Sequence, residues 1–188
     1  MAFEIVVVGA STGGLNALQT LLSGLPAEFH LAVVIVQHRG KGESDLCEFL
    51  TRSSSLAVTE PDDKETVLPG RVYLAPTDYH LLVENGSFAL SIDPPVRFAR
   101  PSIDVLFESA AHEYQERAIG VVLTGANHDG ARGLAEIKLR GGLTMVEDPA
   151  SATCRVMPEA AITQTKVDWI LPVQEIAACL ENLSNSVG

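Results

Sequence analysis

The sequence predicts an α/β protein with an open, doubly wound, mostly parallel sheet, a Rossmann-like three-layer fold interrupted by one β-hairpin. Runs of consecutive apolar, mostly β-branched residues at 5–8, 31–36 and 119–123 are typical of strands buried on both faces. Segments with apolar residues at helical spacing follow these runs. Strands that alternate with amphipathic helices form a parallel sheet covered on both sides.

The first third of the chain is predicted to contain two such strand–helix units. Strand 5–8 leads into a helix whose apolar residues are Leu15, Leu18, Leu21, Leu22 and Leu25. Strand 31–36 ends at Gln37-His38, and the helix after it carries Leu46, Phe49 and Leu50. The loop with Asp62-Asp63 lacks further carboxylates at calcium-loop spacing, so we interpret it as a solvated turn before strand 71–74.

Residues 80–92 are predicted to form the hairpin, because Asn85-Gly86 stands between two apolar runs. An extended link then reaches Ser102, the expected N-cap of a helix. The apolar face of that helix consists of Ile103, Leu106, Phe107, Ala110 and Tyr114.

The last third is predicted to contain three more strands and three helices. Strand 119–123 is followed by a helix with Leu134 and Ile137 that stops at Gly141-Gly142. Strand 143–146, a short helix after Pro158 and strand 168–171 come next. A final helix ends in a polar tail, 184–188, that we expect to be frayed. No repeat or linker divides the chain, so residues 1–188 are expected to form one domain.

Composition narrows the range of functions. The chain has 188 residues and a formal net charge of −11, which argues against nucleic acid and anionic membranes as partners. No apolar run approaches the roughly 20 residues that span a bilayer, so we expect no membrane insertion and a cytoplasmic protein. The three cysteines are not at metal-ligand spacing, and only Cys154, in a loop-like stretch, is a weak candidate for a second nucleophile.

Gly9-Ala10-Ser11-Thr12-Gly13 has the G-x-S-x-G pattern of a nucleophile elbow. It lies between a buried strand and a helix, where the serine hydroxyl projects from the sheet edge and free helix N–H groups could stabilise an oxyanion. A phosphate-binding turn or a plain tight connection is the alternative. A dinucleotide-binding fold would have glycine in place of Ser11 and an acidic residue at the end of the second strand, where Gln37-His38 stands.

Ser11, His38 and Asp129 each follow a buried strand directly. Because sites in such sheets lie at the carboxyl ends of the strands, we expect these three side chains to converge. Serine needs a base to remove its proton, and a carboxylate orients the histidine, so the set suits nucleophilic catalysis. The order Ser, His, Asp differs from that of α/β-hydrolases. His80 is a candidate for lining the site, His128 is a rival base, and Met157 either packs in the core or forms the site floor.

The chain resembles the catalytic domain of the CheB family of chemotaxis protein-glutamate methylesterases over nearly its whole length. The matching segments are residues 9–14, 36–38, 68–76, 78–81, 100–107, 123–125, 129–131 and 141–142. This resemblance implies a serine hydrolase that removes methyl esters from glutamyl side chains of chemoreceptors, releases methanol, and deamidates certain receptor glutamines. It implies methylated chemoreceptor cytoplasmic helices as partners. Serine chemistry needs no cofactor, and because nothing resembles the H-E-x-x-H motif we expect no metal site. By position Ser11 would be the nucleophile, His38 its base and Asp129 the orienting carboxylate, with oxyanion donors near Thr12 and Ala126.

The sequence departs from the family pattern in three places. Ala126-Asn127 stands where Met-Gly is usual, which restricts the backbone near the expected oxyanion donors, and Arg39-Gly40 stands where Met-Pro is common. The family's N-terminal receiver domain does not precede the first strand, so a receiver domain belongs to a longer protein or acts in trans, or the enzyme works without one. A non-catalytic receptor-docking homologue, an esterase for another methylated protein and a nucleotide-dependent reductase remain alternative hypotheses.

Overall fold

The structure is a computed structural model that describes residues 2–39 and 46–185. In this part of the chain seven strands form one sheet: β1 (Ile5–Ala10), β2 (Ala32–Gln37), β3 (Ala57–Thr59), β4 (Arg71–Leu74), β7 (Ala118–Val122), β8 (Leu143–Glu147) and β9 (Trp169–Leu171). Their order is β3-β4-β2-β1-β7-β8-β9, and every pair is parallel. The predicted fold class is therefore confirmed.

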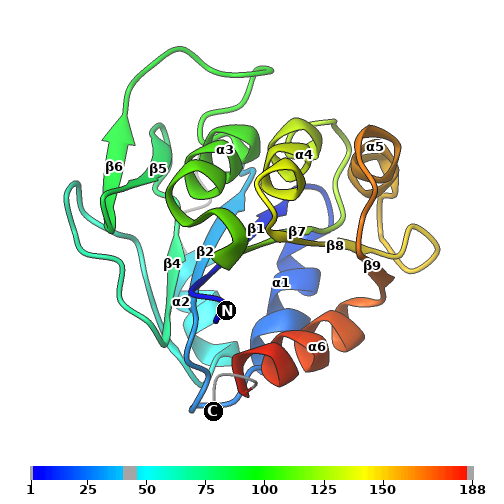
Figure 1. Cartoon of the computed structure of the whole chain (residues 1–188), viewed down its shortest axis with the longest axis horizontal. Coiled ribbons are helices and arrows are strands. Elements are labelled where there is room, and N and C mark those ends of the chain that lie inside the picture. The colour runs from blue at the N-terminus through cyan, green and yellow to red at the C-terminus, as the bar shows by residue number, and fades with distance from the viewer. Residues whose placement is uncertain (1, 40–45, 186–188) are drawn as a thin grey trace.

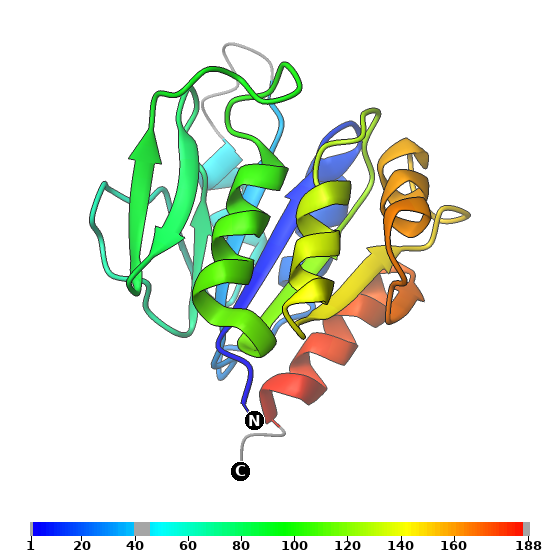
Figure 2. The same cartoon turned by 45° about the horizontal axis from the view of Figure 1, so that its top comes forward.

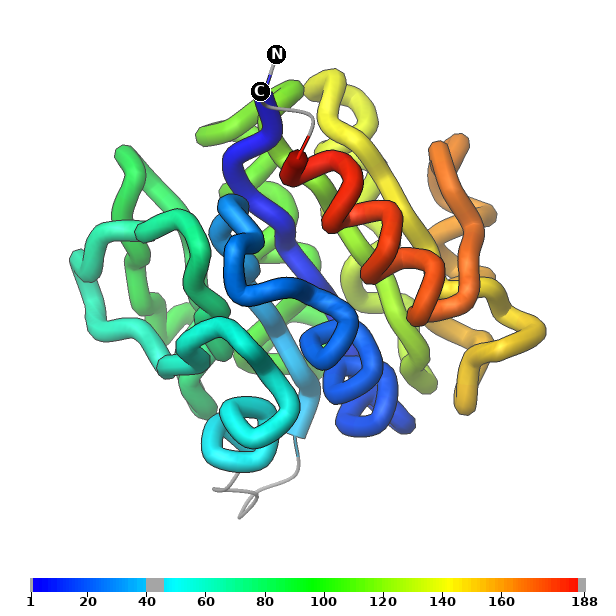
Figure 3. The backbone as a smooth tube through the Cα atoms, turned by 90° about the horizontal axis from the view of Figure 1, so that it is seen from below, coloured from blue at the N-terminus to red at the C-terminus, as the bar shows by residue number. Residues whose placement is uncertain are grey.

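Helices cover both faces of this sheet, which gives three layers (Figures 1 and 2). One face carries α3 (Ile103–Tyr114), α4 (Ala131–Leu139) and α5 (Val156–Gln164), and a 3-10 turn, Gln115–Arg117, follows α3. The other face carries α1 (Gly14–Ser23), α2 (Leu46–Ser53) and α6 (Val173–Asn185), as Figure 3 shows from below. Among the described residues, no helix has both the length and the apolar character that crossing a bilayer requires.

The sheet is buried on both sides, which explains its uninterrupted apolar runs. All six residues of β1 are buried. Val6, Val8 and Ala10 face the core beneath α1 and α6, whereas Ile5 and Val7 face the core beneath α3 and α4. Alternate side chains thus enter two separate hydrophobic cores, and neither face requires a polar residue.

The hairpin is present as predicted, as β5 (His80–Glu84) and β6 (Ser87–Ser91) in a sheet of its own. Its turn residues Asn85 and Gly86 both have positive φ, 51° and 70°, as a two-residue hairpin turn requires. The hairpin packs beside α3 and β4, where the Phe88 and Tyr73 rings lie 4.6 Å apart between centroids. It extends the apolar layer on the α3 side of the main sheet.

Two predicted boundaries are wrong. Helix α5 begins at Val156 and not after Pro158. A proline in the first turn of a helix removes no intrahelical hydrogen bond, so the helix tolerates it there. At the other end of the domain, Ser184 and Asn185 belong to α6, and Ser184 is buried where its Oγ accepts a hydrogen bond from His30 N at 3.0 Å. These two residues are not a frayed tail, and residues 186–188 lie outside the described part.

Two smaller differences concern single elements. Leu15 is 41% exposed, so it does not belong to the buried face of α1. The short edge strand β3 was not predicted, because three residues of which only Val58 is buried give no clear alternating pattern.

Candidate active site

Ser11 lies on a sharp turn between β1 and α1. Its backbone N–H donates to Thr124 O at 2.9 Å, and its carbonyl accepts from Gly14 N at 2.8 Å. Gly13 has φ of 80°, and a Cβ there would lie 2.5 Å from Thr153 Cβ. The turn therefore requires glycine at this position, and it leaves the Ser11 side chain partly exposed at the carboxyl edge of the sheet.

His38 lies next to Ser11 because β1 and β2 are paired in register. Ala10 is the partner of Gln37, and His38 N donates to Ala10 O at 3.0 Å. The Gln37 carboxamide reinforces this pairing, since its Nε2 donates to both Ser11 O, at 2.9 Å, and His38 O, at 2.8 Å. One buried side chain thus holds the backbones of Ser11 and His38 together.

Asp129 follows β7 and reaches His38 from the other side. Its Oδ2 accepts from His38 Nε2 at 2.8 Å and from Ile103 N at 2.7 Å. Its Oδ1 accepts from Ser102 Oγ and Asp104 N, both at 2.9 Å. Burial by itself raises the pKa of Asp129, but the hydrogen bonds from His38, Asp104 and Ile103 outweigh it, so that pKa is lowered. The hydrogen bond from His38, together with those from the N-terminus of α3, therefore favours the ionised form of this buried carboxylate.

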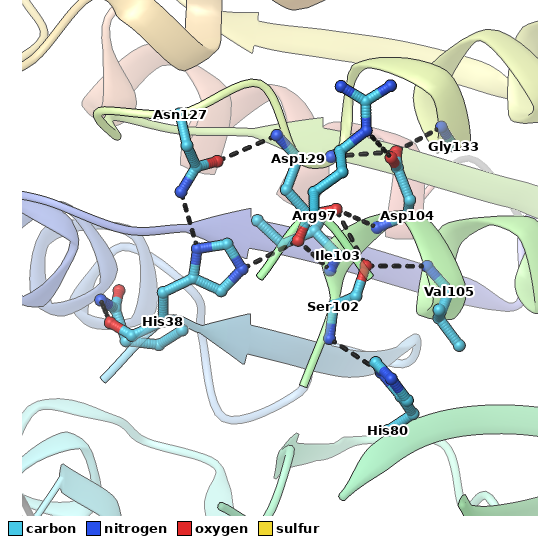
Figure 4. A network of polar contacts seen from close by, with 12 residues as sticks. His38, His80, Arg97, Ser102, Ile103, Asp104, Val105, Asn127, Asp129 and Gly133 are labelled. Carbon is cyan, nitrogen blue, oxygen red and sulfur yellow. Dashed lines mark hydrogen bonds and ion pairs between the residues drawn. The ribbon is translucent and has the colours of Figure 1, made fainter. Parts of the chain in front are cut away.

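The Asn127 side chain contacts the remaining ring nitrogen of His38 (Figure 4). Asn127 Nδ2 lies 3.0 Å from His38 Nδ1, and Asn127 Oδ1 accepts from Asp129 N at 2.9 Å. Since only the amide oxygen can accept from a backbone N–H, Nδ2 must face the ring and donate to it. His38 Nδ1 is then unprotonated, and the ring proton lies on Nε2, directed at Asp129.

Ser11 Oγ makes no hydrogen bond to any described residue. Gly125 lies close to Ser11, because a Cβ at Gly125 would lie 2.9 Å from Ser11 Cβ and 2.0 Å from Met157 Sδ. Met157 is buried, and its side chain borders the same side of Gly125 as Ser11 Cβ does.

Two backbone N–H groups near Ser11 are available to an incoming ligand. Within residues 2–39 and 46–185, neither Thr12 N nor Ala126 N donates a hydrogen bond, and both residues are exposed. Thr124 connects the two loops that carry them, because its Oγ1 donates to Thr12 O at 2.8 Å. The backbone N of Thr124 in turn donates to the buried Glu147 Oε2 at 2.7 Å. Backbone donors without an acceptor among the described residues suit a ligand that carries a negative oxygen.

A second buried carboxylate, Asp104, lies behind Asp129. Its Oδ1 accepts from Gly130 N at 2.9 Å and from Gly133 N at 2.8 Å, the N-terminus of α4. Its Oδ2 accepts no hydrogen bond from the described residues and lies 3.5 Å from Arg97 Nε. Burial raises the pKa of Asp104 despite the opposing hydrogen bond from Gly133.

The other candidates occupy different positions. His80 is buried behind Ser102, where its Nδ1 accepts from Ser102 N at 3.2 Å and its Nε2 faces Pro94 O at 3.1 Å, so both ring nitrogens are engaged. His128 is exposed and lines a surface hollow beside α4 and α5. Cys154 is partly buried, and its backbone N donates to Thr124 Oγ1 at 2.8 Å.

Acidic and cysteine residues give no indication of a metal site. Asp62 and Asp63 are exposed, and Asp63 Oδ1 accepts from Leu90 N at 3.0 Å. In the described ranges no cluster of three or more His, Cys, Asp or Glu side chains could hold a metal ion.

Sequence reasoning missed three residues that shape the site: Gln37, Asn127 and Asp104. Gln37 is a polar residue at the end of an otherwise apolar buried strand, and that position was a signal for a structural hydrogen bond. Asn127 and Asp104 gave no periodic signal, because their roles depend on which loop and helix lie opposite them. A cavity of about 560 Å³, lined by Phe3, His30 and Ser184, lies at the opposite edge of the sheet and shares no residue with this site.

Comparisons with known proteins agree on one family. The family model described as CheB methylesterase matches residues 6–180. The crystal structure of the Thermotoga maritima CheB methylesterase catalytic domain superposes with a TM-score of 0.92 at 36% identity, covering 97% of this chain and 100% of that chain.

Relatives in sequence fall into two length classes. A Leptospira interrogans relative is 46% identical over 179 residues, which are 94% of this chain and 93% of that protein. A protein-glutamate methylesterase/protein-glutamine glutaminase of Anaeromyxobacter dehalogenans is 42% identical over 96% of this chain but only 53% of its own length. One of Pseudomonas aeruginosa is 42% identical over 93% of this chain and 52% of its own length. This chain therefore spans about half the length of the latter two.

Proposed function

The chain belongs to the CheB methylesterase family, and on that basis we propose that it is a serine hydrolase that removes methyl esters from protein glutamyl side chains in chemotaxis adaptation. Deamidation of glutamine side chains is its second activity, as the names of the relatives indicate. Ser11 is the nucleophile, His38 the general base and Asp129 the orienting carboxylate. The observation that carries the assignment is the hydrogen bond of 2.8 Å between His38 Nε2 and Asp129 Oδ2, on a ring whose backbone is paired with that of Ser11.

In the first half-reaction Ser11 Oγ attacks the ester carbonyl carbon while its proton passes to His38 Nδ1. The carbonyl oxygen becomes an oxyanion that accepts hydrogen bonds from Thr12 N and Ala126 N. The bond between the carbonyl carbon and the methoxy oxygen then breaks, and His38 Nδ1 returns the proton to the leaving oxygen. Methanol departs, and the glutamyl group is left as an ester on Ser11.

In the second half-reaction a water molecule replaces Ser11 as the nucleophile. His38 Nδ1 removes a proton from the water as its oxygen attacks the acyl carbon, and the bond to Ser11 Oγ breaks as Oγ takes that proton back. A free glutamyl carboxyl group is formed. With a glutamine side chain the same steps release ammonia in place of methanol. Asp129 stays ionised throughout and stabilises the imidazolium that exists in each half-reaction.

The partners follow from the same assignment. Methylated chemoreceptor cytoplasmic helices are the substrate, which locates the reaction in the cytoplasm. A receiver domain, in a longer protein or in trans, is the second partner and belongs to a two-component system. Nothing in the described residues calls for a cofactor in this reaction, since the hydroxyl, imidazole and carboxylate supply the nucleophile and the proton transfers.

The test is methanol release from a methyl-esterified chemoreceptor cytoplasmic fragment. We expect the protein to release methanol and Ser11→Ala to lose at least roughly a thousandfold in rate, as removal of a triad nucleophile does. The matched control is Ser23→Ala, an exposed serine at the end of α1, which should retain the full rate. A folded protein that releases no methanol would contradict the substrate. Failure of a serine-reactive phosphonate to label Ser11 would contradict the mechanism.

A further inference from the structure

The Asn127 carboxamide joins the proposed general base to the loop that carries Asp129. Nδ2 donates to His38 Nδ1 over 3.0 Å, and Oδ1 accepts from Asp129 N over 2.9 Å (Figure 4). The amide nitrogen and the amide oxygen thus each form a hydrogen bond, and the amide group cannot rotate without breaking both. Asn127 is partly exposed and adjoins Ala126, so it lies at the open side of the site and not behind it.

This contact competes directly with the proposed chemistry. An unprotonated imidazole nitrogen has a single in-plane lone pair, which can accept one good hydrogen bond. His38 Nε2 is engaged by Asp129, so Nδ1 is the nitrogen that must take the Ser11 proton. Because Asn127 Nδ2 already occupies that lone pair, Ser11 Oγ is left without a hydrogen bond among the described residues.

The competition grows as the reaction proceeds. Once Nδ1 has accepted the Ser11 proton it becomes a donor, and the N–H groups of Asn127 then face another N–H group. The amide cannot turn its oxygen to the ring unless it releases Asp129 N. The conformation of Asn127 in this structure therefore stabilises the neutral ring and opposes the imidazolium through which both half-reactions pass.

We propose that Asn127 is a positioning residue that acts as a latch on the base of the free enzyme: it holds the His38 Nδ1 lone pair away from Ser11 and must swing aside before the serine reacts. The proposal rests on the proposed function, because it presupposes that His38 activates Ser11. A substrate whose carbonyl oxygen occupies the site between Thr12 N and Ala126 N would lie next to Asn127 and could displace it. The latch thus couples activation of the base to occupation of the site.

Two substitutions at Asn127 separate this role from a structural one. Asn127→Ser keeps an oxygen that can accept from Asp129 N in the same turn, but its side chain is too short to reach His38. Asn127→Asp keeps the shape and the acceptor for Asp129 N, yet it places an oxygen against Nδ1, which would hold a proton there. The first change opens the latch, whereas the second keeps the base occupied by a proton.

The experiment measures the second-order rate at which a small serine-reactive phosphonate labels Ser11, since this reagent is not a protein substrate and so does not depend on receptor docking. We expect Asn127→Ser to react about three- to tenfold faster than the natural protein, the equivalent of one ordinary hydrogen bond. Asn127→Asp should react about tenfold slower or more, as for a hydrogen bond to a charged group. Asn16→Ser, an exposed asparagine on α1, is the matched control and should leave the rate unchanged.

Nitrogen NMR of the histidine side chains provides a readout that a structural role would not change. With the His38 signals identified by their loss in His38→Gln, the neutral ring should carry its proton on Nε2. The Nδ1 signal should shift in Asn127→Ser as the hydrogen bond from Asn127 disappears. A proton on Nδ1 in the natural protein overturns the proposal, whether or not the variants fold.

The outcomes of labelling distinguish the latch from the proposed function. If Ser11→Ala is labelled as fast as the natural protein, the assignment of Ser11 fails, and the latch fails with it. If labelling requires Ser11 but folded Asn127→Ser reacts no faster, only the latch is overturned. A faster Asn127→Asp also contradicts it, because that variant retains an occupied Nδ1.

Discussion

Asp104 belongs to the start of α3 and binds the N-terminus of α4, whereas Asp129 precedes α4 and binds the N-terminus of α3. Asp129, just before α4, accepts from Ile103 N and Asp104 N at the start of α3. Asp104, in the first turn of α3, accepts from Gly130 N and Gly133 N at the start of α4. Two buried carboxylates thus satisfy backbone donors that two helix ends would leave unpaired. This exchange fixes the carboxylate that accepts from His38 Nε2 relative to both helices (Figure 4).

Removal of the Asp104 carboxyl group should destabilise the protein. Asp104→Ala leaves Gly130 N and Gly133 N buried without an acceptor, so we expect the free energy of unfolding to fall by about 2–4 kcal/mol. Asp104→Asn retains one acceptor oxygen and should cost less than half as much. Urea denaturation measures both, with the exposed Asp62→Ala as control. Equal losses for Ala and Asn would show that the charge, and not the acceptor, is what matters.

The two carboxylates should affect the pH dependence of stability with opposite signs. Burial raises the pKa of Asp104 above 3.8, so as the pH falls toward that value the natural protein should gain stability relative to Asp104→Asn. The pKa of Asp129 is lowered below 3.8, because its hydrogen bonds outweigh burial. Its contribution is present above that pH and is lost as the pH falls further, so the natural protein should lose stability relative to Asp129→Asn.

Urea denaturation at a series of pH values from about 7 to 3 checks this pair of signs. The free energy of unfolding of the natural protein is compared with that of each Asn variant at every pH. If both differences change in the same direction on acidification, the opposite effects of burial and hydrogen bonding that we assign to these two groups are incorrect.

Gln37 should affect catalysis, although its side chain contacts only the backbone oxygens of Ser11 and His38. Gln37→Met has a similar shape but cannot donate to Ser11 O and His38 O, so the two backbones lose the donor that binds both of them. We expect the rate constant of methanol release to fall about tenfold, because small displacements of reacting groups are costly. Exposed Gln19→Met on α1 is the control and should have no effect. A Gln37→Met enzyme with the full rate would show that β1–β2 pairing alone positions the two residues.

Gly125→Ala should inactivate the site while leaving the fold largely intact. The added Cβ would lie 2.0 Å from Met157 Sδ and 2.9 Å from Ser11 Cβ. The Met157 side chain can move, but Ser11 can yield only by displacing its hydroxyl, so we expect a loss of about a hundredfold in methanol release. The double variant Gly125→Ala with Met157→Ala removes only the contact with sulfur. Recovery of activity in that double variant would mean that Met157, and not Ser11, is the sensitive neighbour.

Most of the fold could be predicted from the sequence because its signals are local. Continuous apolar runs identified β1, β2 and β7, Asn85-Gly86 identified the hairpin, and Ser102 marked the start of α3. Errors occurred where the local pattern was ambiguous. A helix was predicted after Pro158, although it begins before this proline at Val156, and the polar residue Ser184 suggested a frayed end, although it is buried against His30.

The site likewise has features that could be predicted from the sequence and features that could not. Because carboxyl ends of neighbouring parallel strands meet, the sequence alone predicted that Ser11, His38 and Asp129 lie at one edge, and the structure places His38 within hydrogen-bond distance of Asp129. The sequence could not show which ring nitrogen faces Asp129, nor that Asn127 occupies the other.

The sequence by itself determined the order and type of the elements, because hydrophobic periodicity and turn residues act within a few positions of the chain. Only the tertiary structure decided the contacts of Gln37, Asn127 and Asp104 with groups up to 89 residues away in the chain. Their partners come from separate strands, loops and helix ends, so those hydrogen bonds exist only once packing has brought the segments together. The hydrogen bonding of the His38 ring is therefore a property of the assembled sheet edge and not of any single motif.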